Sequence, residues 1–498
     1  MHTPTVDAGR TVSGMTTLAP AAPQGTSPRS RSAARPSATP ASARPIPTWW
    51  RDASICAAWG LGVFVVALWV MNDGITGMTT TAGVLTETGR LTGLLASYLL
   101  LLQVFLMARV PFVEQAFGQD TLTRIHRVMG FSSFTLMLAH IGLILLGYAA
   151  DSPLGLWGTI VDVTLNDPGM LLAVAGTVAL CTVVATSARA ARRKLRYESW
   201  HLIHLYAYLG VGLALPHQLW TGRDFLASPL ATTFWWTLYA VLALTVIVFR
   251  VGLPLVRTQR AGLRVTNVEL ERPGTVSVTM SGRGAHRLHA RAGQFFQWRF
   301  LDGPGSSRAN PYSLSAAPRL NPRGETELRL TAAMIGDGSQ RLATLRPGTR
   351  VLVEGPYGRM HPGAATQRKS ILLGAGIGIA PMRALLEALP GGPGDITLVQ
   401  RHRNDADLVL DTEIEHLAQM RGAAYFVLAG HRVPGRDSWL PQQYAEVSDA
   451  DALLRVCPDV LERDVYVCGA PGWMASVETA LRELGVPSEQ IHIEHFTS

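Results

Sequence analysis

Two stretches decide the fold of this chain: TRIHRVMGFSSFTLMLAHIGLILLGYA at residues 123–149 and SWHLIHLYAYLGVGLALPHQLW at residues 199–220. Each is apolar and long enough to form a helix that crosses a bilayer, which takes about 20 residues. Each also carries histidines, and ionisable side chains inside a membrane span are costly and rarely face lipid. The sequence therefore predicts two membrane helices whose histidines face the protein interior.

The spacing of these histidines predicts their chemistry. His126 and His140 are fourteen positions apart, nearly four turns, so they share one helix face about 21 Å apart along the axis. His204 and His217 are thirteen positions apart, which an ideal helix places about 140° apart, and Pro216 can bend the helix. Imidazole is a common axial ligand of haem iron. Two histidines on each of two helices therefore predict two haems stacked across the membrane.

The alternative is that these residues are hydrogen-bonded interior histidines, which a single histidine would support equally well. Four histidines at matched depth on two helices instead favour metal ligation by His126, His140, His204 and His217. His201 lies one turn before His204, but exchanging the two does not correct the angle in the second helix.

Length and composition restrict the class of protein. A chain of 498 residues is too long for one domain, and the apolar spans all lie before Arg257. The net charge of +8 comes mostly from the N-terminal tail and the ends of the spans, and no basic and aromatic surface suggests a nucleic acid partner. The four cysteines show neither metal-site spacing nor a disulfide framework.

Six membrane spans are predicted after a tail, residues 1–48, that is rich in Ala, Pro, Ser, Thr and Arg and is expected to be disordered. The spans are 53–71, 87–108, 123–149, 168–187, 199–220 and 230–252. Basic residues fill alternate connections and acidic residues the others, and positive charge stays on the cytoplasmic side. We therefore expect a multi-pass protein of the plasma (inner) membrane with both termini cytoplasmic.

This orientation pairs His126 with His204 near the cytoplasm and His140 with His217 near the outer face. Arg90 lies toward the outer end of the second span. It has two readings: a side chain that extends to the membrane interface, or a cation near the outer haem that holds a propionate or attracts an anionic acceptor.

Beyond the spans, residues 258–362 contain six short strand-like runs separated by Gly, Pro and polar turns, which predict a small antiparallel β-barrel. The segment GDGSQRLATL interrupts them as a turn that opens a helix. Gly338 and Ser339 there would offer N–H groups and a hydroxyl to a pyrophosphate, although most such helix starts are ordinary caps.

Residues 363–498 alternate strands and helices, which predicts a parallel sheet covered by helices. In SILLGAGIGIAPMRALLEAL, the glycines Gly374, Gly376 and Gly378 lie between a buried strand and a helix, the context that nucleotide binding requires. Cys468 and Gly469 end a later strand, where ligands bind in such sheets, although Cys468 alone reads as a small buried hydrophobic residue.

Together these features resemble the ferric reductase and NADPH oxidase superfamily over residues 53–498. The resemblance implies a six-helix transmembrane bundle with two b-type haems, an antiparallel β-barrel that binds FAD, and an α/β parallel-sheet domain that binds NAD(P)H. The predicted domains are a cytoplasmic tail (1–48), a transmembrane haem domain (49–257), an FAD-binding domain (258–362) and an NAD(P)-binding domain (363–498).

The resemblance also assigns the flavin site. In the segment that begins at Asn310, Tyr312 and Ser313 match the last two positions of the family's flavin motif, in which the aromatic residue packs on the flavin and the hydroxyl approaches its N5. Asn310 stands where the family has Arg or His, which puts a pyrophosphate contact there in doubt. Gly338 and Ser339 match the family's second phosphate contact. Phe496 is the candidate for the C-terminal aromatic that covers the flavin ring, and Ser313, Cys468 and Phe496 are the implied catalytic residues.

The nucleotide site follows in the same way. The segment GAGIGIAP matches the family's glycine turn through Pro381, and Cys468 and Gly469 match the pair beside the nicotinamide. Arg401 and Arg403 follow the second strand, where guanidinium groups suit the 2′-phosphate of NADPH. Acidic residues at 405 and 407 lie close by, and we predict a preference for NADPH over NADH.

The resemblance implies a flavocytochrome b-type reductase that moves electrons from cytoplasmic NAD(P)H through FAD and two haems to an extracytoplasmic acceptor. We expect this acceptor to be ferric iron or another metal chelate. The alternatives are a superoxide-producing NADPH oxidase and an electron conduit to a docked extracytoplasmic partner protein. A transporter with a regulatory nucleotide domain would leave the histidine spacing and the flavin motif unexplained.

Overall fold

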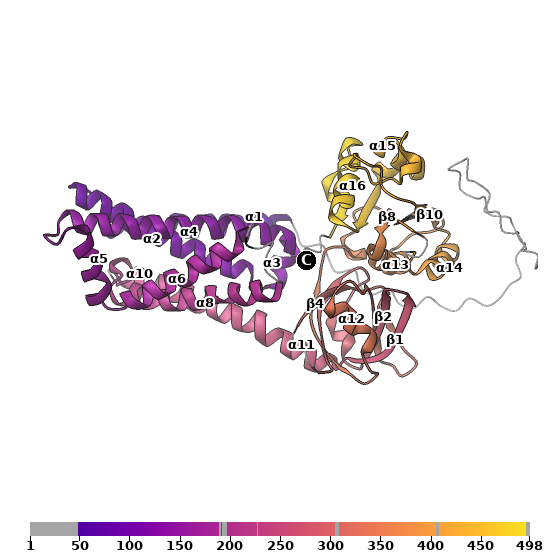
Figure 1. The fold of residues 1–498 in the computed structure, drawn as a ribbon, viewed down its shortest axis with the longest axis horizontal. Helices are drawn as coiled ribbons and strands as arrows, with labels where there is room; N and C mark the ends of the chain where they lie inside the picture. Colours follow the sequence, from indigo (N-terminus) through magenta and orange to yellow (C-terminus); the bar gives the residue numbers. More distant parts are fainter. Residues whose placement is uncertain are drawn as a thin grey trace, which may run out of the picture. The chain divides into compact units, whose positions relative to one another are not determined.

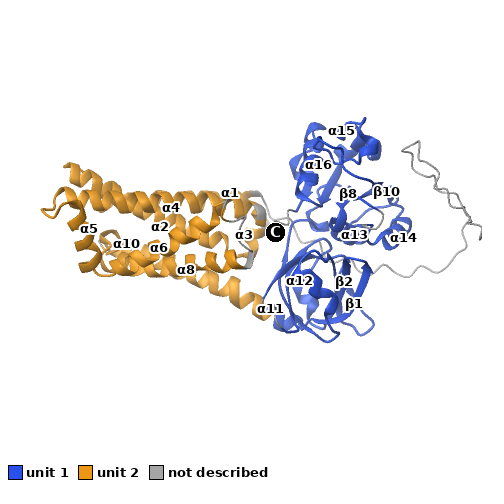
Figure 2. Ribbon diagram, in the orientation of Figure 1, with its two compact units in different colours: residues 1–45, 257–495 blue, residues 46–256, 496–498 orange. Residues whose placement is uncertain are grey.

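The computed structural model describes residues 48–188, 191, 197–226, 228–303, 308–404 and 408–494. They form two compact units, a helical one that ends at Val256 and one that begins at Arg257 (Figure 2). The predicted tail lies outside the described residues up to position 47, as does Phe496 at the other end.

The first unit consists of helices (Figure 1). The long ones are α1 (Thr48–Met71), α2 (Thr81–Leu106), α4 (Gln119–Ala150), α6 (Met170–Ser187), α8 (Tyr197–Trp220) and α10 (Pro229–Thr245). Shorter helices connect them: α3 (Pro111–Phe117), α5 (Gly155–Asn166) and α9 (Arg223–Leu226). A π-helical segment, η1 (Val246–Gly252), continues α10 into α11 (Leu253–Ala261).

Five of the six predicted spans are supported by length and apolar composition. Within the part of the chain that the structure describes, these are α1, α2, α4, α6 and the continuous helix Pro229–Ala261. Helix α8 has 24 residues, but its three histidines and Pro216 lower its hydropathy, and it is not one of the five. The chain is thus a membrane protein, whereas a sixth span stays a prediction.

Small residues bring the membrane helices together in pairs. Helix α4 packs on α2, where a Cβ added to Gly89 would lie 3.0 Å from Ile144. Helix α8 packs on α6, where a Cβ on Gly176 would lie 2.7 Å from the carbonyl oxygen of Gly210. Such close approach of backbones is typical of membrane helix interfaces. The two histidine helices, α4 and α8, therefore pack closely against different partners and not against each other.

The second unit begins with an antiparallel sheet. Its strands are β1 (Arg264–Arg272), β2 (Thr275–Gly282), β3 (Phe295–Leu301), β4 (Asn310–Ser313), β5 (Arg319–Leu320), β6 (Thr326–Ala333) and β7 (Arg350–Tyr357). They pair in the order β4-β3-β7-β1-β2-β6-β5. An isolated bridge joins Leu314, just after β4, to Leu330 on β6. The antiparallel sheet is as predicted, whereas closure into a barrel stays a prediction.

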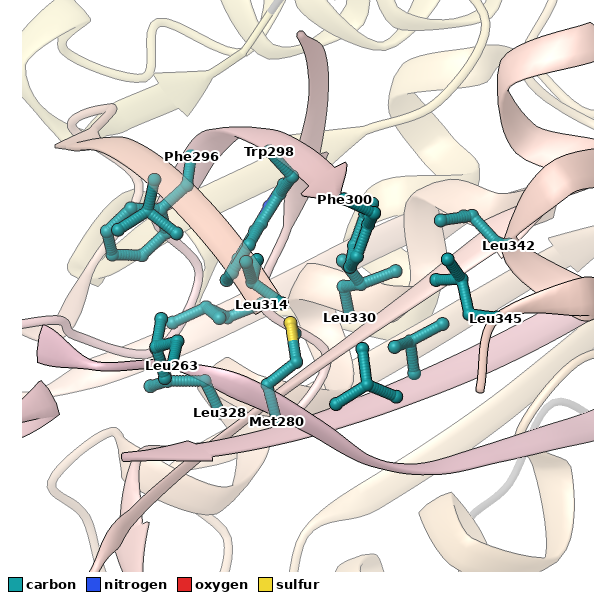
Figure 3. Packing of buried hydrophobic residues seen from close by; sticks show 14 of the residues in the cluster. Leu263, Met280, Phe296, Trp298, Phe300, Leu314, Leu328, Leu330, Leu342 and Leu345 are labelled. Atoms are coloured by element: carbon teal, nitrogen blue, oxygen red, sulfur yellow. The ribbon is translucent and has the colours of Figure 1, made fainter. Parts of the chain in front are cut away.

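This sheet encloses an apolar core (Figure 3). Phe296, Trp298 and Phe300 alternate along β3 and point inward, because successive side chains of a strand point to opposite faces. Leu330 on β6 is fully buried in the same cluster. The indole Nε1 of Trp298 donates a hydrogen bond of 2.9 Å to the carbonyl of Tyr312, so the core fixes the position of β4.

The remaining strands form the predicted parallel sheet: β8 (Lys369–Ala375), β9 (Ile396–His402), β10 (Ala424–Ala429), β11 (Arg463–Cys468) and β12 (Ile491–Ile493). Their order is β10-β9-β8-β11-β12. The accompanying helices are α13 (Ile379–Ala388), α14 (Asp411–Arg421), α15 (Asp449–Val456) and α16 (Pro471–Glu483). Strands β9 and β10 lie on one side of β8, and β11 and β12 lie on the other, so the strand order reverses at β8. Ligands of such sheets bind in the crevice at this reversal.

The core of the antiparallel sheet provides a stability prediction. Leu330→Ala should destabilise the protein by about 2–5 kcal/mol, because it leaves a cavity where the side chain is fully buried. Leu320→Ala is the control, because Leu320 is 72% exposed, and should change stability by less than about 0.5 kcal/mol. Denaturation of the detergent-purified chain followed by tryptophan fluorescence measures both; equal midpoints for the two variants would contradict the packing.

Candidate functional site

The first histidine pair joins α4 to α8. The ring centroids of His126 and His204 are 6.1 Å apart. The Nδ1 atom of His126 lies 3.1 Å from the carbonyl oxygen of Gln103 on α2, and a carbonyl can only accept, so Nδ1 carries the proton. The Nδ1 atom of His204 lies 3.3 Å from the hydroxyl of Ser187 on α6. Each ring is thus held through Nδ1 by a neighbouring helix, an arrangement typical of metal-binding histidines that bind through Nε2.

In the second pair only His140 is held in this way, because the Nδ1 atom of His217 is buried without a hydrogen-bond partner among the described residues. The Nδ1 atom of His140 donates to the carbonyl of Gly89 on α2 at 2.8 Å. A Cβ at Gly93 would lie 2.5 Å from this nitrogen, so only glycine leaves room for the ring. His217 on α8 lies within electrostatic range of His140, and a Cβ at Gly169 would lie 2.8 Å from its backbone nitrogen. The structure thus places His126 close to His204 and His140 within electrostatic range of His217, and haem ligation by these pairs stays a prediction.

Arg90 lies beside the second pair in a buried ion-pair cluster. Its guanidinium contacts Asp224 on α9 at 2.5 and 2.8 Å and Glu87 at 2.5 Å, and all three side chains are nearly buried. It also reaches the carbonyl of Asn72 at 3.4 Å. Two carboxylates and a carbonyl therefore hold the side chain next to Gly89 in a buried ion-pair cluster.

The predicted flavin motif lies on β4. Tyr312 pairs with Phe296 and Ser313 with Phe295 on the neighbouring strand β3. The Ser313 hydroxyl is buried and has no hydrogen-bond partner among the described residues. Burial raises the pKa of Tyr312 to about 12, so its phenol stays neutral. A buried hydroxyl without a partner suits a ligand that offers a polar atom there.

A small cavity of about 150 Å³ lies at the other end of β4. It is lined by Phe300, Arg308, Asn310, Asp337, Gly338, Arg341, Leu342 and Leu345. A Cβ on Gly338 would lie 2.9 Å from the Asn310 amide oxygen, so glycine keeps the cavity open. Sequence reasoning missed two arginines that line this cavity, Arg308 and Arg341. Arg341 forms an ion pair with Asp302. Arg308 precedes Asn310 by two residues, which was the available signal.

Ser339 uses its hydroxyl within its own turn. The hydroxyl accepts from the Gly336 N–H at 3.1 Å and donates to the Gly336 carbonyl at 2.9 Å. The helix α12 (Asp337–Gln340) that it opens has only four residues. The contacts of Ser339 are thus those of an ordinary helix cap. Gly338 is the residue of this turn that keeps the cavity beside Asn310 open.

The glycine turn lies against the end of β11. Gly374 on β8 pairs with Cys468, and a Cβ on Gly378 would lie 2.2 Å from the Cys468 carbonyl oxygen. Gly376 has a φ of +55°, a left-handed conformation that favours glycine. Pro381 lies in the first turn of α13, where its missing N–H costs nothing. The structure therefore brings the two predicted nucleotide motifs into contact, with Gly469 packed against Trp473.

Glu494 is a further residue at this site that sequence reasoning missed. Burial, and then the charge of Glu494, raise the pKa of the Cys468 thiol above its usual range. A Cβ on Gly358 would lie 1.9 Å from the Glu494 carboxylate and 3.2 Å from the Phe295 ring. Because Phe295 pairs with Ser313, the Glu494 carboxylate is near the residues around Ser313 as well as those around Cys468. Phe496, two residues later, lies outside the described residues.

The predicted 2′-phosphate arginines have different surroundings. Arg401 is buried on β9 and donates to the main-chain carbonyls of His402 and Leu428. Burial, helped by the charges of Arg432 and Arg403, lowers the pKa of Arg401 to about 10. Arg403 and Arg432 are both exposed, and an Arg432 nitrogen comes within 3.7 Å of a Cβ on Gly472 at the start of α16. Sequence reasoning missed Arg432, which lies beyond β10.

These features define a class of protein: a histidine-bearing membrane helix unit followed by an antiparallel lobe and a nucleotide-type parallel lobe. Two family models match the chain. The ferric reductase like transmembrane component matches residues 92–215, and the oxidoreductase NAD-binding domain matches residues 372–479. The chain therefore joins a ferric reductase-type membrane domain to a ferredoxin-reductase-type oxidoreductase module, which confirms the predicted resemblance.

Individual proteins resemble the second unit. The chain is 30% identical to the ferredoxin reductase component of 3-ketosteroid-9-alpha-monooxygenase from Mycobacterium tuberculosis, over 43% of this chain and 56% of that protein. It is 27% identical to ferredoxin–NADP reductase B from Sorangium cellulosum, over 39% and 80%. A solved ferredoxin NADP+ reductase from Neisseria gonorrhoeae aligns at 18% identity over 47% and 96%, with a TM-score of 0.36. The chain spans about half the length of the first of these relatives.

The surroundings of Cys468 lead to a pH prediction. Because its pKa is raised, the folded thiol should remain protonated at pH 8.5, and iodoacetamide should label it at least about ten-fold more slowly than in the unfolded chain. Glu494→Gln removes a negative charge, which favours the thiolate, so the pH midpoint of labelling should fall. Mass spectrometry of the labelled peptide measures both rates. A midpoint that is the same in both proteins would contradict the assigned influence of Glu494.

Proposed function

We propose that the protein is a flavocytochrome b-type reductase that transfers electrons from cytoplasmic NAD(P)H, through FAD and two b-type haems, to an extracytoplasmic acceptor. The observation that carries the proposal is the distance of 6.1 Å between the ring centroids of His126 and His204, which belong to helices that pack on different partners. The ferric reductase-type membrane domain supports the same conclusion.

The histidines fit haem ligation. A centroid separation of 6.1 Å suits one metal ion between the two rings, because it accommodates two metal–imidazole bonds of about 2 Å each together with the distance from each nitrogen to its ring centre. The Nδ1–H groups of His126 and His140 are bonded to main-chain carbonyls, so the lone pair of each ring is on Nε2. His126 and His204 would hold one haem, and His140 and His217 the other. The bound iron would supply single-electron transfer, and each haem would be held by two histidines of this chain.

The residues around β4 fit FAD. The buried Ser313 hydroxyl has no partner among the described residues, and Tyr312 beside it is neutral and half-buried. The cavity at Asn310 and Gly338 suits a pyrophosphate, because Arg308 and Arg341 line it. Arg308 would supply the positive charge that Asn310 lacks. Flavin chemistry allows two electrons to be accepted together and released singly.

The parallel lobe fits a nicotinamide nucleotide. An added Cβ on Gly376 would have no atom within 4 Å, so this glycine gives a phosphate-bearing ligand close access to the backbone, and α13 directs its N-terminus to the same place. Gly374 and Gly378 instead let the turn pack against Ile379 and the Cys468 carbonyl. Cys468 would lie beside the nicotinamide. Arg403, rather than the buried Arg401, would meet the 2′-phosphate with Arg432, which supports NADPH over NADH.

The proposed acceptor is a ferric or other metal chelate at the extracytoplasmic end of the membrane unit, near His140 and His217. The proposed orientation places both termini in the cytoplasm and the chain in the plasma membrane. No contact of the described residues selects dioxygen or a partner protein instead.

The proposal is tested by a pair of matched histidine variants. His204→Leu should lose one of the two haems and the NADPH-dependent reduction of the other, because it removes one axial ligand. His201→Leu, one turn earlier on the same helix, should keep both. Visible spectra of the purified protein before and after anaerobic NADPH and FAD measure haem content and reduction, and ferrous iron and superoxide are assayed in intact cells.

A wild-type protein without haem absorbance, or with haem that NADPH and FAD never reduce, would end the proposal. Equal haem loss in the two variants would remove His204 from the ligand set. Superoxide without ferrous iron would favour the oxidase.

A second test addresses the phosphate cavity. Arg308→Ala should weaken FAD binding about 10- to 100-fold, since a hydrogen bond to a charged group contributes about 1.5–3 kcal/mol. Arg323→Ala, an exposed turn arginine of the same lobe, is the control and should bind FAD like the wild type. Flavin fluorescence titration of the apoprotein gives both dissociation constants. Unchanged affinity in Arg308→Ala would exclude that arginine from the phosphate site.

A further inference from the structure

An arginine in the middle of α13 joins the nucleotide lobe, which contains the parallel sheet, to the flavin lobe, which contains the antiparallel sheet. Arg383 on α13 is 5% exposed. Its guanidinium donates to the Ser315 carbonyl at 3.3 Å, to the Glu413 carboxylate at 2.5 Å, and to the carboxylate of Glu387. A buried guanidinium that serves three acceptors in different segments holds all three in one geometry, because its donors form a rigid fork.

The flavin lobe contributes a second arginine to the same cluster. Arg329 on β6 donates to the other oxygen of Glu413 at 2.9 Å and to the hydroxyl and carbonyl of Ser315 at 3.1 and 3.2 Å. The Ala317 N–H donates to Glu387 at 2.9 Å. Both lobes therefore hold the segment after β4 by its backbone, and Glu413 on α14 bridges the two arginines.

The position of this cluster gives it a functional meaning. Ser315 follows the flavin-motif residue Ser313 by two positions, and Arg383 follows Pro381 of the nucleotide turn by two positions. The hydrogen bond between Arg383 and Ser315 thus connects two residues that are each only two positions from a motif. A displacement of Arg383 should therefore displace β4 as well.

The Glu413 bridge is charged under ordinary conditions. Burial alone would raise its pKa, but the hydrogen bond from Arg329 and the charges of Arg383 and Arg329 lower it instead. A different ion pair, Arg272 with Asp411 at 3.0 Å, also joins the lobes but is more exposed and touches neither motif. The Arg383 cluster, unlike this pair, adds a connection to the segment after the flavin strand β4.

We propose that Arg383 is a positioning residue that fixes the flavin strand relative to the nicotinamide nucleotide turn and so sets the geometry of hydride transfer. This rests on the proposed function. The hydride carries one hydrogen and two electrons from the nicotinamide of NADPH, which is oxidised to NADP+, to the flavin, which is reduced. Arg383 touches neither reactant and acts through Ser315 and Glu413.

The first test needs neither cofactor. In the full-length apoprotein, Arg383→Lys and Glu413→Gln should increase amide hydrogen exchange in residues 314–317, because the backbone there loses its anchor. Asp411→Asn is the matched control: it breaks an ion pair between the same lobes and should leave that segment protected. Exchange in this segment that is unchanged in both Arg383→Lys and Glu413→Gln would overturn the link, whatever the activity of the protein.

The second test measures hydride transfer directly. With FAD bound and NADPH saturating, anaerobic stopped-flow reduction of the flavin should slow about 10- to 100-fold in Arg383→Lys, because a displacement of about 1 Å can cost this much. The affinity for NADPH and the melting temperature should change little. Asp411→Asn should reduce its flavin within about two-fold of the wild-type rate.

The outcomes separate this proposal from the proposed function. Wild-type flavin that NADPH does not reduce would contradict the proposed function, and the exchange experiment would still decide the link. A normal wild-type rate with an unchanged rate in Arg383→Lys would overturn the positioning role alone. Equal slowing in Arg383→Lys and Asp411→Asn would also overturn it, since general attachment of the lobes would then explain the effect.

Discussion

The membrane unit depends on two hydrogen bonds from imidazole Nδ1 to main-chain carbonyls of α2, those of His126 to Gln103 and of His140 to Gly89. These bonds exist only because glycines let α4 approach α2 closely. They fix both the orientation and the tautomer of each ring, so the Nε2 atoms of His126 and His140 are oriented by the protein alone, without a ligand. The separation of α4 and α8 follows from the same packing, because α4 packs closely on α2 and α8 packs closely on α6.

The second unit uses backbone proximity in the same way. Gly378 approaches the Cys468 carbonyl so closely that no side chain fits between the glycine turn and the end of β11. Gly358 likewise leaves room for the Glu494 carboxylate beside the antiparallel lobe. The site is thus built on glycines that allow close approach, and charged side chains lie around it: Arg308, Arg341, Arg383 and Arg432.

Sequence reasoning succeeded where the information is local. The apolar lengths predicted most helices within a few residues, and the strand, glycine turn and helix around Gly376 were found because they are continuous in sequence. It failed where the fold brings distant segments together: Glu494 near Cys468, or Arg432 near Arg403. Arg401 was expected to reach a phosphate, but it lies on a strand that is buried along its whole length and donates to main-chain carbonyls instead. The hydropathy of α8 was reduced by the same histidines that made it recognisable.

The close contact between Gly93 and the His140 ring also limits how this sequence can vary. A methyl group at position 93 would collide with a nitrogen that belongs to another helix, so the two positions cannot change independently. Related sequences that keep histidine at the position of His140 should keep glycine at the position of Gly93. Sequences that lose this histidine could carry a larger residue at the position of Gly93. The pair therefore acts as a single inherited unit, although the two residues are 47 positions apart in the chain.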